Sequence, residues 1–253
     1  MKFILSHCLL VFTVLSFSQN QTEMTRYKRD SLRSVFSNSS NADSAIVEAY
    51  KKIAISYRGD NQDSLFLYLE KLKDYSEKNT SYNGFYEYYF LKARVYKKSN
   101  PGFSFDTVEI YLNKAIENAK KLDSESVLKQ VNTYYDLSYD FLKYRKLDKA
   151  FLYANKANDL ALKNNDIRAI EKSSMIMGAY HFYGSMKYDT SLHYLNKADS
   201  LFSKYHKNHP DLGTTYSLKG SVLMSIENTK EALEYFYKAK QIFEIERQKT
   251  GEK

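Results

Sequence analysis

The chain contains no tryptophan, one cysteine, two prolines and eight glycines among its 253 residues. The single cysteine, Cys8, cannot form an intramolecular disulfide, which excludes a small fold held together by disulfide bridges. So few glycines and prolines argue against an all-β sandwich, which needs turn-forming residues at many places. This scarcity instead favours long helices that are joined by short polar loops.

The overall composition is that of an ordinary globular protein. Hydrophobic residues make up 43% of the chain and charged residues 27%, so wholesale disorder is not expected. The length suits one large domain or two small ones. Lys and Arg number 38 against 30 Asp and Glu, which gives a mild net charge of +8. Because acidic residues accompany the lysines throughout, we expect solvated helix faces and no nucleic-acid binding.

The first 18 residues have the pattern of a secretory signal peptide. Lys2 supplies a positive charge, and residues 3–17 form a mostly apolar run. Ser16 and Ser18 then place small residues at positions −3 and −1 of a cleavage before Gln19. The run is shorter than the roughly 20 residues of a membrane-spanning helix, although an uncleaved anchor is the alternative. We predict an exported, periplasmic protein with no membrane span after cleavage.

A repeated segment runs through most of the remaining chain. Its copies are residues 65–72, 108–115, 149–157, 190–198 and 231–239. Their last residues, from Leu72 to Ala239, are spaced by 43, 42, 41 and 41 residues. A fixed period of this length is typical of helical-repeat proteins. The predicted organisation is therefore a signal peptide (1–18), an N-terminal lead or capping segment (19–41) and a helical-repeat domain (42–253).

Each repeat contains two stretches with helical spacing. In the last repeat, Tyr216, Gly220 and Leu223 recur at intervals of four and three residues, as on one face of an α-helix. A second stretch between Ala232 and Ala239 has the same intervals. Polar turn residues separate the two stretches. The repeat unit is therefore predicted to be a helical hairpin.

This hairpin resembles the tetratricopeptide repeat (TPR) family. The residues that match the family pattern in type and spacing are Tyr216, Gly220, Leu223, Ala232, Phe236 and Ala239. Lys219 stands where the family has a leucine, and Glu244 where it has a late proline. The resemblance implies an all-α, right-handed superhelical solenoid of about five TPR-like helical hairpins. A HEAT or armadillo solenoid is the alternative, because the period is nearer 41 than 34 residues.

The second-helix pattern behind a signal peptide also resembles a narrower group, the exported TPR sensor regions of bacterial regulators. In that group a membrane helix and a cytoplasmic helix-turn-helix or kinase module follow the array. This chain stops at Lys253, directly after the last repeat. We therefore expect a stand-alone member, a truncated relative or a fragment of a larger regulator.

The resemblance further implies a partner-binding groove, because TPR arrays present the first helix of each hairpin to a concave surface. The corresponding residues here are Tyr50, Tyr57, Arg58, Phe90, Arg94, Lys97, Asn132, Tyr135, Tyr139, Lys143, Tyr180 and Tyr183. Tyrosine offers a large apolar area and a hydroxyl group. A protein or peptide segment with aromatic or aliphatic anchors and some acidic residues would suit such a surface. Asn132 alone does not make the carboxylate clamp that some TPR proteins possess.

Catalytic and metal-binding patterns are weak. His206 and His209 lie three residues apart in a connector, and we expect no metal site there. Ser126 and Lys129 match a Ser-x-x-Lys element, and residues 249–251 match Lys-Thr-Gly, but that chemistry needs the second element on a strand. Phosphate loops and nucleophile elbows do not occur. We therefore predict no enzymatic activity and no cofactor.

The expected function is a TPR scaffold that binds a protein or peptide. The first alternative is the ligand- or partner-sensing region of a signalling or transcription regulator whose membrane and output modules are absent from this chain. The second is an accessory arm of an exported enzyme complex. An uncovered end of a solenoid also predicts self-association.

Overall fold

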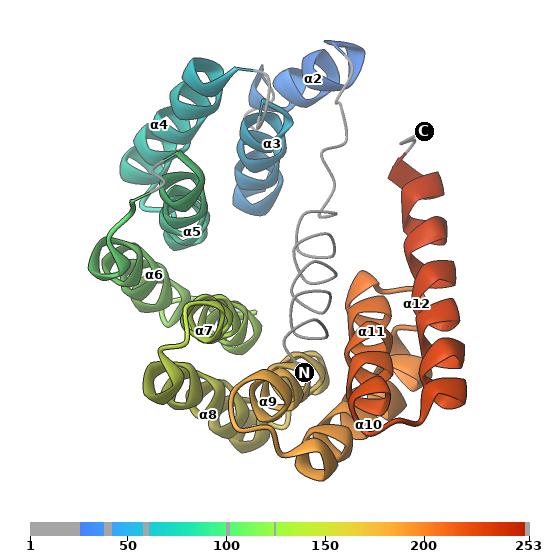
Figure 1. Ribbon diagram of the computed structural model, residues 1–253. Helices are drawn as coiled ribbons and strands as arrows, with labels where there is room; N and C mark the ends of the chain where they lie inside the picture. Colours follow the sequence, from blue (N-terminus) through green and yellow to red (C-terminus); the bar gives the residue numbers. More distant parts are fainter. Residues whose placement is uncertain (1–25, 38–41, 58–60, 100–101, 124, 251–253) are drawn as a thin grey trace. The chain divides into compact units, whose positions relative to one another are not determined.

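The structure is a computed structural model that describes residues 26–37, 42–57, 61–99, 102–123 and 125–250. The predicted signal peptide and Arg58 lie outside the described residues. Every regular element within them is a helix (Figure 1). The elements are α2 (Arg26–Arg33), the 3₁₀ helix η1 (Ser34–Ser37), α3 (Asp43–Ser56), α4 (Gln62–Asn79), α5 (Tyr82–Ser99), α6 (Phe105–Ala119), α7 (Ser126–Lys143), α8 (Leu147–Asn164), α9 (Ile167–Tyr183), α10 (Tyr188–Tyr205), α11 (Pro210–Ser225) and α12 (Thr229–Thr250). The all-α prediction is confirmed.

Helices α3 to α12 form five consecutive hairpins, as the repeat spacing predicted. The first helices of the hairpins are α3, α5, α7, α9 and α11, and the second helices are α4, α6, α8, α10 and α12. Each repeated segment found in the sequence lies on a second helix. The architecture is therefore a helical-repeat solenoid.

The chain divides into two compact units, and the boundary lies within α7. The N-terminal unit is Gln21–Thr133 and contains α2 to α6 together with the start of α7. The C-terminal unit includes Tyr134–Lys253, with the rest of α7 and helices α8 to α12.

Residues at the ends of the helices explain where the helices begin and stop. The side chains of Asn61 and Asp166 accept hydrogen bonds from backbone N–H groups in the first turns of α4 and α9. Thr80 and Asn165 end α4 and α8 in the left-handed conformation. Pro210 occupies the first turn of α11, where its missing N–H group costs nothing.

Small residues allow the two helices of a hairpin to approach closely. A Cβ atom at Gly220 would lie only 2.8–3.0 Å from ring atoms of Phe236, and one at Gly178 would lie 2.6 Å from Leu195. Ser138 of α7, at the position equivalent to Gly220, donates a hydrogen bond of 2.8 Å to the carbonyl oxygen of Ala150. The large residue of one helix therefore fills the space that the small residue of the other leaves.

The described part of the predicted lead or capping segment packs on the first hairpin. The Phe36 ring stacks on Tyr50 of α3, with 4.1 Å between the ring centroids. The Nε of Arg33 donates a 2.9 Å hydrogen bond to the hydroxyl of Tyr68 on α4. Helices α2 and η1 therefore cover part of the first hairpin.

Candidate partner-binding surface

The predicted groove residues lie on or directly after four of the first helices, α3, α5, α7 and α9. Lys143 is exposed, and the other ten described members of the set are half-buried. A half-buried side chain is held in place by its neighbours while part of it stays accessible. The set therefore has the exposure that a recognition surface requires, although its members differ in what they contact.

Tyr50 and Tyr57 contact the N-terminal helices. Tyr50 stacks on Phe36, and burial raises the pKa of its hydroxyl above the ordinary value. The Nη2 of Arg33 donates a 3.1 Å hydrogen bond to the Tyr57 hydroxyl, and the guanidinium of Arg29 lies 4.8 Å from the Tyr57 ring centroid. Both tyrosines therefore take part in packing α2 and η1 against the first hairpin.

Phe90 and Arg94 form a paired aromatic and cationic site on α5. Phe90 stacks on Tyr86 at a centroid distance of 5.5 Å, and the guanidinium carbon of Arg94 lies 4.5 Å from the Phe90 ring centroid. Such a contact between a cation and a ring face is attractive and holds the side chain over the ring. Lys97 follows Arg94 by three residues and continues this basic side of α5.

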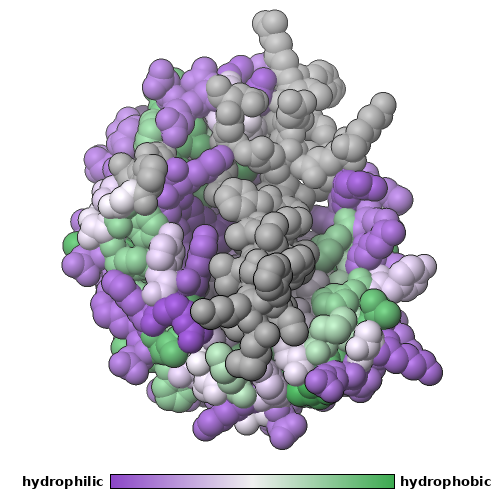
Figure 2. Space-filling model, viewed as in Figure 1, coloured by the Kyte–Doolittle hydropathy of each residue, from purple (hydrophilic) through white to green (hydrophobic). Residues whose placement is uncertain are grey.

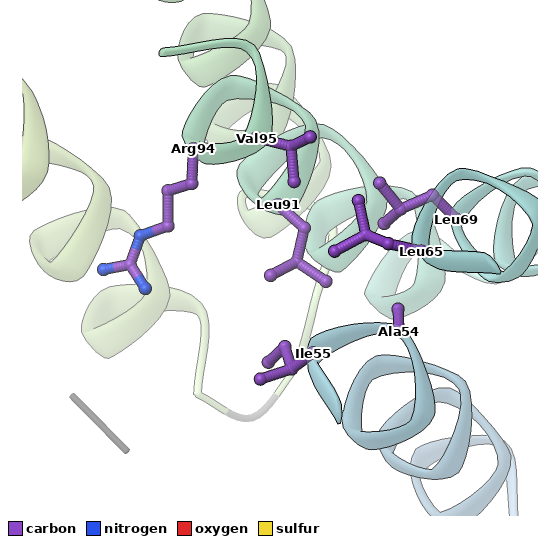
Figure 3. Close-up of a pocket in the computed structure, with 7 residues that line it drawn as sticks. All are labelled: Ala54, Ile55, Leu65, Leu69, Leu91, Arg94 and Val95. Carbon is purple, nitrogen blue, oxygen red and sulfur yellow. The ribbon is translucent and has the colours of Figure 1, made fainter. Parts of the chain in front are cut away.

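A small apolar pocket lies behind Arg94. Its lining consists of Arg94 and six apolar residues from α3, α4 and α5, namely Ala54, Ile55, Leu65, Leu69, Leu91 and Val95. Figure 3 shows the Arg94 side chain directed away from the cluster that the apolar residues form. The pocket has a volume of about 10 Å³, which holds about one water molecule. Arg94 is therefore anchored beside a packed core and directs its charge outward.

In the C-terminal unit, α7 carries a row of three predicted residues at intervals of four, Tyr135, Tyr139 and Lys143. The rings of Tyr135 and Tyr139 are nearly parallel, at an angle of 6° and a centroid distance of 6.2 Å. The ammonium of Lys172 on α9 lies 4.1 Å from the Tyr135 ring centroid. These contacts give α7 an ordered aromatic surface that ends in an exposed lysine.

Tyr180 and Tyr183 extend the aromatic surface to α9. The Tyr180 ring lies 4.9 Å from that of Phe151 on α8, and the Tyr183 ring lies 4.3 Å from that of Phe182. The Nη1 of Arg145 donates a 2.6 Å hydrogen bond to the backbone carbonyl of Tyr183. The end of α9 is therefore tied to the connector that follows α7.

A set of buried and half-buried charges lies between successive first helices, and the sequence pattern did not predict it. In the N-terminal unit, Oε1 of Glu87 on α5 lies 2.8 Å from Nζ of Lys129 on α7 and 3.6 Å from Nζ of Lys51 on α3. Burial by itself lowers the pKa of Lys51, but the nearby carboxylates of Glu87 and Glu48 raise it above the ordinary value. One carboxylate therefore joins three first helices.

The C-terminal unit has a comparable ion pair. Nζ of Lys172 on α9 lies 2.8 Å from Oδ2 of Asp211 on α11. Lys129 and Asp211 each stand nine residues before the small residue of their own helix, Ser138 or Gly220. A charge that recurs at this position is the signal that could have revealed the pairs from the sequence.

Two further buried groups lie near the junction of the fourth and fifth hairpins. Glu171 is only 2% exposed and lies 2.8 Å from Nδ1 of His206. Lys219 is 4% exposed and donates to Oδ2 of Asp199 at 2.6 Å and to the hydroxyl of Tyr235 at 2.7 Å. Lys219, which stands where the TPR pattern has a leucine, is therefore a buried cation with two hydrogen-bond partners.

The chemistry of this surface is that of aromatic rings beside cations. Guanidinium and ammonium groups bind carboxylates, and tyrosine and phenylalanine rings bind apolar side chains. In the part of the chain that the structure describes, no cluster of three or more His, Cys, Asp or Glu residues is placed to hold a metal ion. None of the helices in that part combines the length and the apolar character needed to cross a membrane.

Comparison with known proteins supports the fold. No family model matches the chain, and no curated protein matches it in sequence. BtubC (BKLC) from P. vanneervenii has a similar structure, with a TM-score of 0.60 and 18% identity over 84% of this chain and 87% of that protein.

A second similar structure is a signal transduction ATPase with numerous domains (STAND) from Pyrococcus horikoshii, which has a tetratricopeptide repeat sensor. The TM-score is 0.51 and the identity 15%, over 93% of this chain and 35% of that protein. At such identities the likeness is one of fold. It agrees with a TPR-like helical-repeat solenoid.

Proposed function

We propose that this chain is an exported scaffold that binds a protein or peptide segment along the first helices of its hairpins. It recognises its partner without covalent chemistry, cofactor or metal. The partner has aromatic or aliphatic anchor residues and acidic residues. Nucleic acid is not its ligand, because the basic residues of the surface are interspersed with aromatic and acidic groups.

The observation that carries this proposal is an ordered set of rings and cations in each unit, on α5 in the N-terminal unit and on the later part of α7 in the C-terminal unit. Phe90 and Arg94 on α5, and Tyr135, Tyr139 and Lys143 on α7, recur at intervals of four residues and touch one another or their neighbours. Side chains that are ordered before binding lose little conformational entropy when a partner arrives. Rigid rings beside a positive charge are typical of residues that dominate binding energy in protein interfaces.

A second candidate function is partner sensing within a signalling or transcription regulator whose membrane and output modules are absent from this chain. The fold-level likeness to the STAND protein with a tetratricopeptide repeat sensor favours this candidate. The two candidates share the same binding surface. They differ in whether binding is passed to an attached module, which the coding sequence downstream of Lys253 would reveal.

Export to the periplasm is part of the proposal and rests on the pattern of residues 1–18. The intact mass of the protein from its own source tests it. A chain that begins at Gln19 supports the proposal. A chain that retains the first 18 residues supports the membrane-anchor alternative.

A capture experiment tests the binding surface. Residues 19–253 serve as bait in an extract of the source organism, beside a variant in which Arg94, Tyr139 and Tyr180 are changed to alanine. The matched control carries Ile110→Ala, Leu152→Ala and Lys156→Ala, which remove two exposed apolar groups and one cation from the second helices α6 and α8. Circular dichroism and thermal unfolding confirm that all three proteins are folded.

We expect a partner that is captured by the unchanged chain and by the control variant and is lost by the first variant. Equal capture by all three proteins would contradict the proposed surface. Loss by the control variant alone would move the binding site to the second helices.

A further inference from the structure

An open groove runs along α12 beside α11, at the C-terminal end of the last hairpin. Its volume is about 420 Å³, and Phe236, Phe243 and Arg247 are among the residues that line it. Leu233 and Tyr237, on the same side of α12, are 59% and 62% exposed. Figure 2 shows apolar residues, in green, reaching the surface where α11 and α12 lie, among hydrophilic residues in purple.

In the fourth hairpin, the face of α10 that corresponds to this groove is covered by the hairpin that follows. Phe202 of α10 stands 41 residues before Phe243, is only 2% exposed and stacks on His209 at the start of the fifth hairpin. Ser203 likewise lies 3.3 Å from the hydroxyl of Tyr216 on α11. On α10 the surface is therefore covered by the next hairpin, whereas α12 packs on α11 and no described helix of its own unit covers its far side (Figure 1).

The charged residues along this face of α12 can pair with the same residues of a second copy of the helix. Tyr237, Lys240, Glu244 and Arg247 follow one another at intervals of three or four residues, and Nζ of Lys240 lies 3.7 Å from Oε1 of Glu244 in the same helix. In an antiparallel copy of this helix, centred between Lys240 and Glu244, each lysine stands opposite a glutamate. Tyr237 then stands opposite Arg247, a favourable pair of ring and cation.

We propose that the C-terminal hairpin is a self-association surface, on which α12 of one copy packs antiparallel against α12 of a second copy about a two-fold axis. Such an interface is isologous, so both copies use the same residues and the assembly closes as a dimer. A parallel arrangement would place Lys240 beside Lys240 and is unfavourable. Head-to-tail stacking is disfavoured because α2 and η1 cover part of the first hairpin. This proposal is independent of the proposed partner-binding surface.

Sedimentation equilibrium of residues 19–253 over about 1–100 µM tests the proposal. We expect a reversible monomer–dimer equilibrium. The single variants Lys240→Glu and Glu244→Lys each place like charges across the axis, and each should weaken dimerisation about tenfold or more. An equimolar mixture of the two variants should form a heterodimer, because opposite charges then face each other at both positions.

The mixing experiment separates the interface from the internal stability of α12. In each single variant, positions 240 and 244 carry the same charge, so the ion pair within α12 cannot form. Dimerisation that recovers on mixing can therefore come only from contacts between the two copies. The matched control is Lys73→Glu, which breaks an exposed pair of the same spacing with Glu77 on α4 and should leave dimerisation unchanged.

Three results would overturn the proposal. The first is a chain that stays monomeric up to about 100 µM, whether or not it binds a helix of another protein at this groove. The second is undiminished dimerisation of both single variants. The third is a mixture of variants that stays monomeric although circular dichroism shows that both are folded.

Discussion

Nζ of Lys219 lies 2.6 Å from Oδ2 of Asp199, across the interface between the fourth and fifth hairpins. The lysine comes from α11 and the aspartate from α10, and the Tyr235 hydroxyl of α12 accepts a second hydrogen bond from the same ammonium. One buried cation therefore joins three helices. The energetic value of such a group is best measured by removing one partner at a time.

Changing Lys219 to methionine should lower the free energy of unfolding by about 2–4 kcal/mol, because it leaves the Asp199 carboxylate without its cation. Urea unfolding followed by circular dichroism measures this loss. Asp199→Asn combined with Lys219→Met should cost less than the sum of the single changes, since the two residues act on the same interaction. Strictly additive losses would contradict the coupling.

Changing Gly220 to alanine should destabilise the fifth hairpin, because the added methyl group meets the Phe236 ring at 2.8 Å and this overpacking costs about 1–3 kcal/mol. This loss should outweigh the roughly 1 kcal/mol that alanine gains over glycine as a helix former. Gly102 has no atom within 4 Å of an added Cβ, so Gly102→Ala serves as the control and should stay within about 0.5 kcal/mol. A stabilised Gly220 variant in thermal unfolding would refute the close packing.

Acidification should weaken the C-terminal unit through His181. Burial, assisted by the charge of Lys187, lowers the pKa of His181 below its ordinary value of 6.5. The unfolded chain therefore takes up this proton more readily than the folded one, and the free energy of unfolding should fall as the pH drops below 6.5. Urea unfolding at several pH values should show a smaller fall for His181→Gln. His193→Gln, on α10, controls for the loss of a histidine, and the same fall in both variants would refute the assignment.

Removing the aromatic contact of the N-terminal helices should loosen the first hairpin. Phe36→Ala deletes a half-buried ring that stacks on Tyr50, with an expected loss of about 1–2 kcal/mol, less than for a fully buried phenylalanine. Hydrogen exchange of the α3 amides should accelerate accordingly. Phe66→Ala, at an exposed position of α4, should leave the same amides nearly unchanged. Equal exchange in both variants would show that η1 does not protect the hairpin.

The hairpins could be predicted from the sequence because their pattern is local and repeats. The closing residues of the repeats, from Leu72 to Ala239, are all buried, as the spacing required. The close packing of Phe236 against Gly220 could likewise be predicted, because a large residue fills the space beside a small one. Patterns of this kind need only a comparison of the chain with itself.

The candidate surface could be predicted only in part, because contacts between distant segments leave no local pattern. The predicted residues of α5 and α7 lie on first helices, and all of them except the exposed Lys143 are half-buried, while their role in binding a partner stays a prediction. The contact of Tyr57 with Arg33 joins residues 24 positions apart, and α2 has no repeated sequence pattern that would predict this contact. Lys219 was a departure from the family pattern in the sequence, and only its neighbours Asp199 and Tyr235 show why a charge is tolerated there.

Glu87 has a consequence for how the N-terminal unit melts. Repeat proteins are commonly described by an intrinsic stability for each repeat and a coupling between nearest neighbours. Because the Glu87 carboxylate lies between Lys51 of the first hairpin and Lys129 of the third, it adds a coupling that spans three consecutive repeats. The start of the array should therefore lose its structure as one cooperative block, with no stage in which a single hairpin has frayed from the others.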